Sequence, residues 1–411
     1  MNVPKLRFPE FRDAGEWDRD VLGKVSVFVN ERMPLEQLSL SNYVSTVNIL
    51  PDYEGMVTAP KLPPSGSATR FKINDILISN IRPYLKKVWF ASKEGGASND
   101  VIVIRAKEKV GDRYLSFMLK NDVFIEYVMK GAKGVKMPRG DIFLMQEYPL
   151  AYPSKPEQQK IADCLSSIDD LITAQTQKLD TLKTHKKGLM QHLFPAEGET
   201  LPKLRFPEFQ DAGEWEEKHL GKICEIKGGK RIPKGFSLTN EKTDYPYVRV
   251  SDMYMGGIDT SSVLYIPSEI EKQIRSYKIS KNDLFITVAG TIGIVGEVPE
   301  ELDNANLTEN ANKIIVKSIA KKYLLHYLTG ESAQQLISSS VTNNAQPKLA
   351  LERIRLFPIP VPSPEEQQKI ADCLSSIDDL IIAQTQKLAT LKTHKKALMQ
   401  QLFPAMEEVS S

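Results

Sequence analysis

The chain has 411 residues, a formal net charge of +2 and three cysteines. This length predicts two or three domains. The near-neutral charge excludes a histone-like polycation, so any surface for nucleic acid must be local. Three cysteines exclude a disulfide framework, and no long apolar run or signal-peptide pattern is present. We therefore expect a cytoplasmic protein without a membrane segment.

The chain opens on a segment that is later repeated. Residues 4–25 read PKLRFPEFRDAGEWDRDVLGKV, and residues 202–223 read PKLRFPEFQDAGEWEEKHLGKI. The segment mixes aromatic residues with prolines and charges. We expect a packed, mostly irregular lead-in that ends on a strand or a helix start at Leu22–Val27.

Residues 26–152 form a first variable block, in which short β-like runs are broken by turns. A helical pattern follows, and a loop rich in glycine and lysine then leads to a closing strand. The expected elements are strands at Ser41–Leu50, Ile76–Ile81, Lys87–Ala91, Val101–Arg105 and Glu147–Tyr152, a helix at Tyr114–Met129, and a loop at Gly131–Gly140.

A long helix is expected at residues 153–196, and its sequence returns at residues 362–405 with six differences. Pro156 lies where proline is tolerated at the start of a helix, and Pro195 ends the helix. About 37 helical residues would give a rod of about 55 Å.

The apolar positions of this helix form a narrow stripe. From Ile161 to Leu193 they alternate steps of four and three once Gln175 and Lys186 are counted, which is the 3.5-residue repeat of a coiled-coil seam. Such a stripe needs another helix, and the second copy in the same chain is the nearest partner. The alternative is that each helix packs on its own globular domain.

Residues 224–361 form a second variable block with the same order of elements. Its side chains differ from those of the first block, so the sequence predicts related domains with divergent surfaces. The expected elements are strands at Tyr247–Val250, Leu284–Val288, Lys313–Val316 and Leu356–Val361, a helix at Lys321–Ile337, and a loop at Thr342–Lys348.

Together these patterns predict an α+β chain with a pseudo-twofold internal repeat. Two globular domains would be joined by two long antiparallel α-helices that form an intramolecular coiled coil. The expected limits are 1–152 for the first domain, 153–196 for the first helix, 197–361 for the second domain, 362–405 for the second helix and 406–411 for a tail.

The repeated PKLRFPEF…GEW lead-in and the repeated EQQKIADCL…LKTHKK helix closely resemble the specificity (S) subunit of type I restriction-modification systems. The resemblance covers essentially the whole chain. It implies two target-recognition domains on double-stranded DNA, each reading one half of an asymmetric bipartite site. It also implies that the helix pair sets the spacer and docks two methyltransferase (M) subunits, which two restriction (R) subunits can join.

Chemistry is expected in the partners and not in this chain. The sequence lacks an Asn/Asp-Pro-Pro-aromatic loop, a phosphate-binding loop and zinc-ligand spacing. A nuclease triad could be assembled only from the scattered residues Asp252, Glu269 and Lys272, which match no motif. We expect no cofactor here, with S-adenosylmethionine, ATP and Mg²⁺ bound by partners. The assembled complex would then act as an adenine-N6 DNA methyltransferase and ATP-dependent endonuclease. The alternative function is a coiled-coil adaptor whose terminal domains bind proteins.

Basic loops supply the candidate DNA contacts. Arginine suits guanine, asparagine and glutamine suit adenine, and lysine mostly binds phosphates; the alternative is a solvated charged loop. The first block contributes Asn80, Arg82, Lys86, Lys87, Lys133, Lys136 and Arg139. The second block contributes Lys227, Lys230, Arg231, Lys234, Arg249, Asn343, Asn344, Gln346 and Lys348. We expect Tyr84 to pack rather than stack on a base.

The LKTHKK motif near the end of each helix leaves three roles open. Its lysines could bind DNA phosphates, bind acidic partner surfaces, or form a solvated helix face. We expect His185 and His394 to be helix-surface residues, and Cys164 and Cys373 to be small core residues and not metal ligands.

Overall fold

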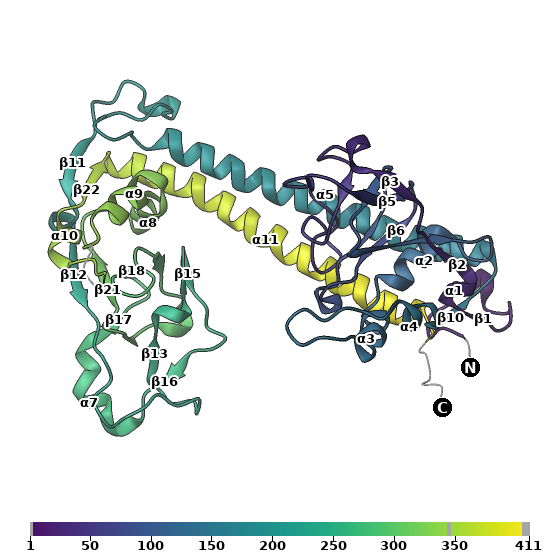
Figure 1. The fold of residues 1–411 in the computed structure, drawn as a ribbon. Helices are drawn as coiled ribbons and strands as arrows, with labels where there is room; N and C mark the ends of the chain where they lie inside the picture. The colour runs from purple at the N-terminus through teal and green to yellow at the C-terminus, as the bar shows by residue number, and fades with distance from the viewer. Residues whose placement is uncertain (1–2, 343–346, 405–411) are drawn as a thin grey trace. The chain divides into compact units, whose positions relative to one another are not determined.

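The computed structural model describes residues 3–342 and 347–404 (Figure 1). The chain divides into two compact units, one made of residues 1–176 and 386–411 and the other of residues 177–385. Each unit contains one lead-in, one variable block and a part of each long helix. Among the helices of the described residues, none has the length and apolar character needed to cross a membrane.

The first unit is built on two four-stranded sheets and a strand pair. The first sheet has the order β2-β9-β6-β7, with β2 at Ser26–Phe28, β9 at Val101–Ala106, β6 at Ile76–Ser79 and β7 at Val88–Phe90. The second has the order β3-β5-β8-β4, at Arg32–Pro34, Ser67–Phe71, Gly95–Ala97 and Tyr43–Val44. The pair joins β1 (Asp18–Val21) to β10 (Pro149–Tyr152). The helices are α1 (Leu22–Val25), α2 (Asp112–Leu119), α3 (Asp122–Lys130) and α4 (Ile142–Gln146).

Strand β6 lies in the core of this unit because both of its faces are apolar. Ile76 and Ile78 pack on the side of α2 and α3. Leu77, which points to the opposite face, packs with Trp89 and Val103. The alternation follows from the two-residue period of a strand. A continuous apolar run therefore marks a strand that is buried on both sides.

The second unit repeats this plan. Its sheets have the orders β12-β21-β18-β19 and β16-β13-β20-β17, with the pairs β14-β15 and β11-β22. The strands are β11 (Glu216–His219), β12 (Cys224–Gly228), β13 (Pro246–Val248), β14 (Met253–Tyr254), β15 (Gly257–Ile258), β16 (Leu264–Tyr265), β17 (Lys278–Ile279), β18 (Leu284–Thr287), β19 (Val295–Glu297), β20 (Ala305–Leu307), β21 (Ala311–Val316) and β22 (Pro358–Val361). The helices are α6 (Leu220–Ile223), α7 (Glu271–Ile274), α8 (Lys321–Thr329), α9 (Glu331–Ser339) and α10 (Leu351–Arg355).

One expected helix in each unit is wrong, and in the same way. The helices expected at Tyr114–Met129 and Lys321–Ile337 are each split into two, α2 with α3 and α8 with α9. In the first unit Asn121 causes the break, because its side chain caps α3 by accepting a hydrogen bond from the Val123 amide at 3.1 Å. In the second unit Gly330 separates the two helices with an extended backbone.

The strand expected at Ser41–Leu50 is also wrong, since only Tyr43–Val44 forms a strand and Ile49 makes an isolated antiparallel bridge with Met56. The buried Asn48 side chain explains the difference. It accepts a hydrogen bond from the Ser45 amide at 2.7 Å and donates to the Tyr43 carbonyl at 3.1 Å, which folds the chain into turns.

The lead-in is irregular, as expected, and it holds the start of a long helix. In the first unit the Arg7 guanidinium donates two hydrogen bonds of 2.7 Å to the Glu157 carboxylate. In the second unit Arg205 binds Glu366 in the same way, at 2.7 and 2.8 Å. These carboxylates lie in the first turn of α5 (Lys155–Leu193) and α11 (Pro364–Leu402).

Helices α5 and α11 have 39 residues each and pair in antiparallel fashion within each unit, which confirms the expected coiled coil (Figure 1). The lysine of each seam crosses to the other helix. Lys395 lies 2.5 Å from Asp169 in the first unit, and Lys186 lies 2.6 Å from Asp378 in the second. These reciprocal ion pairs fix the register of the helix pair.

The cysteines and histidines predicted not to be metal ligands differ in their exposure. Cys164 and Cys373 are half-buried, while His185 and His394 are exposed. Within the described residues no group of three or more His, Cys, Asp or Glu side chains could hold a metal ion.

Candidate nucleic-acid interface

The two basic loops of the first unit lie side by side although they are far apart in the sequence. Asn80 directly follows β6, and its amide donates to the Asp100 carbonyl at 2.8 Å. Its carbonyl accepts from the Gly140 amide at 3.2 Å, and the Arg82 amide donates to the Pro138 carbonyl at 2.8 Å. The structure therefore unites both candidate clusters of the first block into one surface.

The segment after β6 has an unusual backbone. Arg82 has φ of 52° and Lys86 has φ of 54°, on either side of a short 3-10 turn at Pro83–Leu85. Non-glycine residues seldom adopt this left-handed conformation, and such positions cluster at binding sites. Arg82 is exposed, and within the described residues its guanidinium has no ion pair. Tyr84, which we expected to pack, is 48% exposed.

The second loop of this surface is a short hairpin at residues 133–139. Lys133 and Arg139 close it through two backbone hydrogen bonds of 2.9 Å. Its cations differ in whether they form an ion pair. Lys133 lies 3.4 Å from Asp141 and Arg139 lies 3.0 Å from Asp100, whereas Lys136 is exposed and has no ion pair within the described part of the chain.

The second unit has an equivalent surface, identified by the same backbone hydrogen bonds. The Val288 amide donates to the Asn310 carbonyl at 2.8 Å, and the Leu349 amide donates to the Val288 carbonyl at 3.0 Å. Val288 thus corresponds to Asn80, and Lys348, which is exposed, corresponds to Arg139. The expected contacts Asn343, Asn344 and Gln346 lie outside the described residues.

The sequence did not point to the segment after β18, which is the counterpart of the Arg82 segment. Gly290 occupies the position of Arg82 and has φ of 77°, so both units place a left-handed residue there. A glycine three residues after a buried strand was the signal that could have identified it. The two units therefore share the backbone conformation at Arg82 and Gly290 but differ in the side chain.

Gly229, which directly follows β12, lies close to protein backbone. A Cβ atom on Gly229 would lie 2.0 Å from the Thr308 carbonyl oxygen, and the Lys230 amide donates to the Leu307 carbonyl at 2.8 Å. Lys230 also places its ammonium 5.6 Å from the centre of the Tyr277 ring. Arg231 lies 2.5 Å from Glu309 and remains largely exposed.

Several other candidates are engaged within their own unit. Lys87 donates to the Thr46 carbonyl at 2.6 Å, and burial lowers its pKa. Arg249 binds both oxygens of the buried Asp252 at 2.6 and 3.0 Å. This carboxylate, one of the three residues considered for a nuclease triad, is therefore already paired. Lys86 pairs with Asp122 at 2.8 Å and Lys227 with Glu225 at 2.8 Å. Among the candidate contacts that the structure describes, the exposed cations without an ion pair are Arg82, Lys136, Lys230, Lys234 and Lys348.

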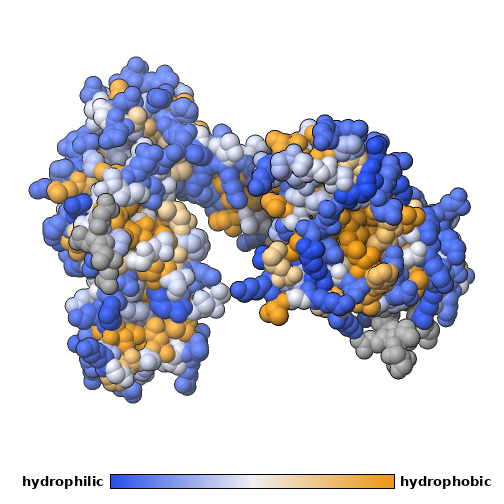
Figure 2. Space-filling view, in the orientation of Figure 1, coloured by the Kyte–Doolittle hydropathy of each residue, from blue (hydrophilic) through white to orange (hydrophobic). Residues whose placement is uncertain are grey.

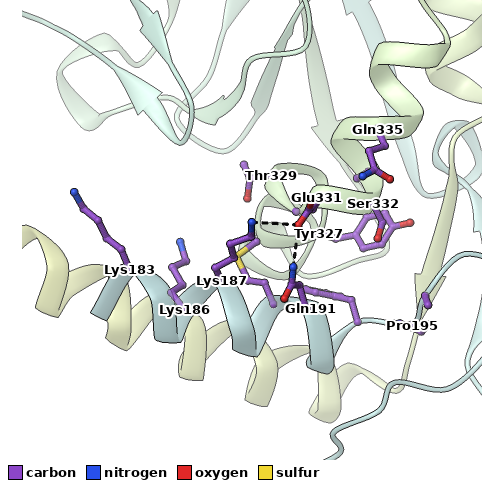
Figure 3. A pocket seen from close by; sticks show the side chains of 15 residues that line it. Lys183, Lys186, Lys187, Gln191, Pro195, Tyr327, Thr329, Glu331, Ser332 and Gln335 are labelled. Atoms are coloured by element: carbon purple, nitrogen blue, oxygen red, sulfur yellow. Dashed lines mark hydrogen bonds and ion pairs between the residues drawn. The ribbon is translucent and has the colours of Figure 1, made fainter. Parts of the chain in front are cut away.

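The LKTHKK lysines of α5 line a cavity of about 570 Å³ in the second unit, together with the turn between α8 and α9 (Figure 3). There Glu331 accepts a hydrogen bond of 2.9 Å from Gln191 and lies 3.5 Å from Lys187. A cavity of about 300 Å³ lies at the equivalent place in the first unit, where Lys396 pairs with Asp122 at 3.0 Å. These lysines therefore bind their own unit in part, and a fully solvated helix face is excluded.

One family model matches both halves of the chain. The model describes the type I restriction modification DNA specificity domain and matches residues 25–184 and 212–393. The chain belongs to this family. Its repeated block and helix are therefore two copies of the specificity domain.

Named relatives and solved structures agree with this family. The specificity subunit of the type I restriction enzyme MjaVIII from Methanocaldococcus jannaschii is 25% identical over 327 residues, which are 76% of this chain and 75% of the relative. The specificity subunit of EcoR124I/EcoR124II from Escherichia coli is 26% identical over 254 residues, 60% and 59% of the two chains. The crystal structure of a type I S subunit from M. genitalium matches 98% of this chain and 100% of its own, with a TM-score of 0.63 at 18% identity. This structural likeness concerns the fold alone.

Proposed function

We propose that this specificity chain recognises DNA through its two loop surfaces, each reading one half of an asymmetric bipartite site. The observation that carries the proposal is the pair of equivalent surfaces with different side chains. Arg82 faces solvent where the other unit has Gly290, and Arg139 stands where the other unit has Lys348. Equal scaffolds with unequal contacts suit two different half-sites.

The free cations of each surface suggest a division of roles. Arg82 is exposed and held by a fixed backbone, so its planar fork suits the O6 and N7 acceptors of guanine. Lys136 and Lys348 are exposed point charges and suit phosphates. Lys87 and Arg249 hold loops in place, and their effect on DNA would be indirect.

The long helices would dock the partners that carry the chemistry. Because α5 and α11 have nearly the same sequence, they present the same side chains twice, which suits two copies of one partner. We propose two M subunits at these helices and, through them, two R subunits. S-adenosylmethionine, ATP and Mg²⁺ would bind to those partners in the cytoplasm, and adenine-N6 methylation and ATP-dependent cleavage would belong to the complex.

A gel-shift experiment separates this function from that of a coiled-coil protein adaptor. The chain, purified with its M subunit, is titrated with a target duplex and a scrambled duplex at several salt concentrations. Selective binding that weakens steeply with salt supports DNA recognition, because phosphate contacts release counterions. Binding that ignores sequence or salt would favour the adaptor.

A further inference from the structure

The tip of the hairpin at residues 133–139 carries two apolar side chains that are exposed to solvent. Val135 is 100% exposed and Met137 is 52% exposed. Ile142 and Phe143, which follow the hairpin, are 42% and 81% exposed. Single exposed apolar residues are ordinary, but here four lie within nine residues. Figure 2 shows apolar residues at the surface of this unit among hydrophilic ones.

The base of the hairpin is fixed, so its tip is a projection with a defined position. Pro138 is buried, and its carbonyl accepts the Arg82 amide. Gly140 is packed so closely that a Cβ atom there would lie 2.3 Å from the Met145 methyl group. The two backbone bonds between Lys133 and Arg139 close the loop above this base. The valine and methionine at the tip have not folded back onto their own unit.

The charges around the tip indicate which occupant it meets. Lys133, Lys136 and Arg139 lie in the hairpin itself, and Arg82 lies in the adjoining segment. Lys133 pairs with Asp141 and Arg139 with Asp100, whereas Arg82 and Lys136 have no ion pair within the described residues. A purely apolar protein surface would leave Arg82 and Lys136 without partners. A polyanion whose interior is apolar, namely stacked base pairs between two phosphate chains, satisfies both kinds of side chain.

We propose that this hairpin is a wedge that enters the first half-site, with Val135 and Met137 placed between neighbouring base pairs and Lys136 on a flanking phosphate. The inference rests on the proposed function and adds DNA deformation to it. Apolar side chains inserted at a base step unstack it and kink the duplex by about 20–90°. Since TA and CA/TG steps deform most easily, the first half-site would contain or adjoin such a step.

The second unit provides a contrast from its sequence. Its corresponding loop reads Thr-Asn-Asn-Ala-Gln-Pro-Lys over residues 342–348 and contains no valine, leucine, isoleucine or methionine. The wedge therefore belongs to one half-site, and the deformation of the bound DNA would be asymmetric.

The test measures base unstacking in the complex of the chain with its M subunit. The target is first read from the methylation pattern. 2-Aminopurine, which pairs with thymine, then replaces each adenine on either strand of both half-sites and their flanking base pairs, except the methylated adenine. Wild type should raise the fluorescence at one step of the first half-site only. Val135→Ser with Met137→Ser should abolish this rise and weaken binding on the order of tenfold, while the salt dependence stays unchanged because no phosphate contact is lost.

A matched control has two exposed valines of the same unit changed, Val47→Ser and Val57→Ser, which are 68% and 48% exposed. This control should behave as wild type. Selective binding by the wild type without any unstacking overturns the wedge and leaves DNA recognition standing. Loss of the M subunit in the wedge variant, with DNA binding retained, makes the tip a protein contact and also overturns the wedge. Absence of selective binding in the wild type removes the proposed function itself.

Discussion

The buried arginine–glutamate pair of each lead-in allows a quantitative prediction. In the first repeat the Arg7 and Glu157 side chains are 7% and 1% exposed and share two hydrogen bonds of 2.7 Å. Removing the arginine leaves a buried carboxylate without its counter-charge. Arg7→Met alone should therefore lower the free energy of unfolding by about 3–5 kcal/mol. Arg7→Met combined with Glu157→Leu should recover most of this loss, because well-packed apolar residues often replace a buried ion pair at little cost.

The second repeat is a matched comparison with one extra bond. Glu366 binds Arg205 and also accepts a hydrogen bond of 3.2 Å from the Trp215 indole. In the first repeat the Trp17 indole nitrogen has no partner within the described residues. Arg205→Met with Glu366→Leu leaves the Trp215 nitrogen newly unpaired. The free energy of unfolding that this double variant recovers should therefore be smaller than in the first-repeat double variant, by about 1–3 kcal/mol.

Urea unfolding followed by circular dichroism measures these differences, with the transition of each unit fitted separately. The expected order of stability is wild type, then the first-repeat double variant, then the second-repeat double variant, then the single arginine variants. If both double variants are as unstable as the single ones, the lost counter-charge is not the cause. If the two double variants are equal, the indole bond contributes nothing.

Three further predictions concern DNA contact, pH and helix length. Arg82→Ala should weaken binding by about 1–3 kcal/mol and relax specificity at one base pair, whereas Lys136→Ala should weaken all sequences alike and reduce the salt slope by about one; competition binding at three salt concentrations distinguishes them. Burial, with Lys186 and Lys322 nearby, lowers the pKa of His326 to about 3, so the folded state resists protonation. Stability should be complete above the unfolded pKa of about 6.5 and fall as pH decreases towards 3, by about 2 kcal/mol at pH 5; His326→Gln should flatten this dependence in urea unfolding. An insertion of seven residues in both α5 and α11 preserves the seam repeat and lengthens each helix by about 10 Å. It should lengthen the unread spacer of the DNA site by about three base pairs. Methylation mapping that shows an unchanged spacer would refute this role of the helices.

The sequence could predict the helices and the central strands because their patterns are local. The stripe from Ile161 to Leu193 is a property of one segment, and its duplicate supplies the partner. The run at β6 likewise marks a strand without further context. The break at Asn121 escaped prediction because the apolar periodicity continues across it, while a single capping side chain decides the outcome.

The candidate interface was predictable in composition but not in arrangement. Arg82 and Lys136 were both expected contacts, yet only long-range backbone bonds such as that between Asn80 and Gly140 place their loops on one surface. Sequence also cannot show which charges are already used. Arg249 is bound by Asp252 three residues later, a contact that depends on the turn between them.

Single-molecule sequencing of the methylated bases in a host that produces this chain with its M subunit tests the central claim most directly. Two recognition surfaces with different side chains predict one methylated motif made of two unlike half-sites separated by a fixed unread spacer. A continuous motif, a palindrome of two identical half-sites, or methylation without sequence preference would contradict the account.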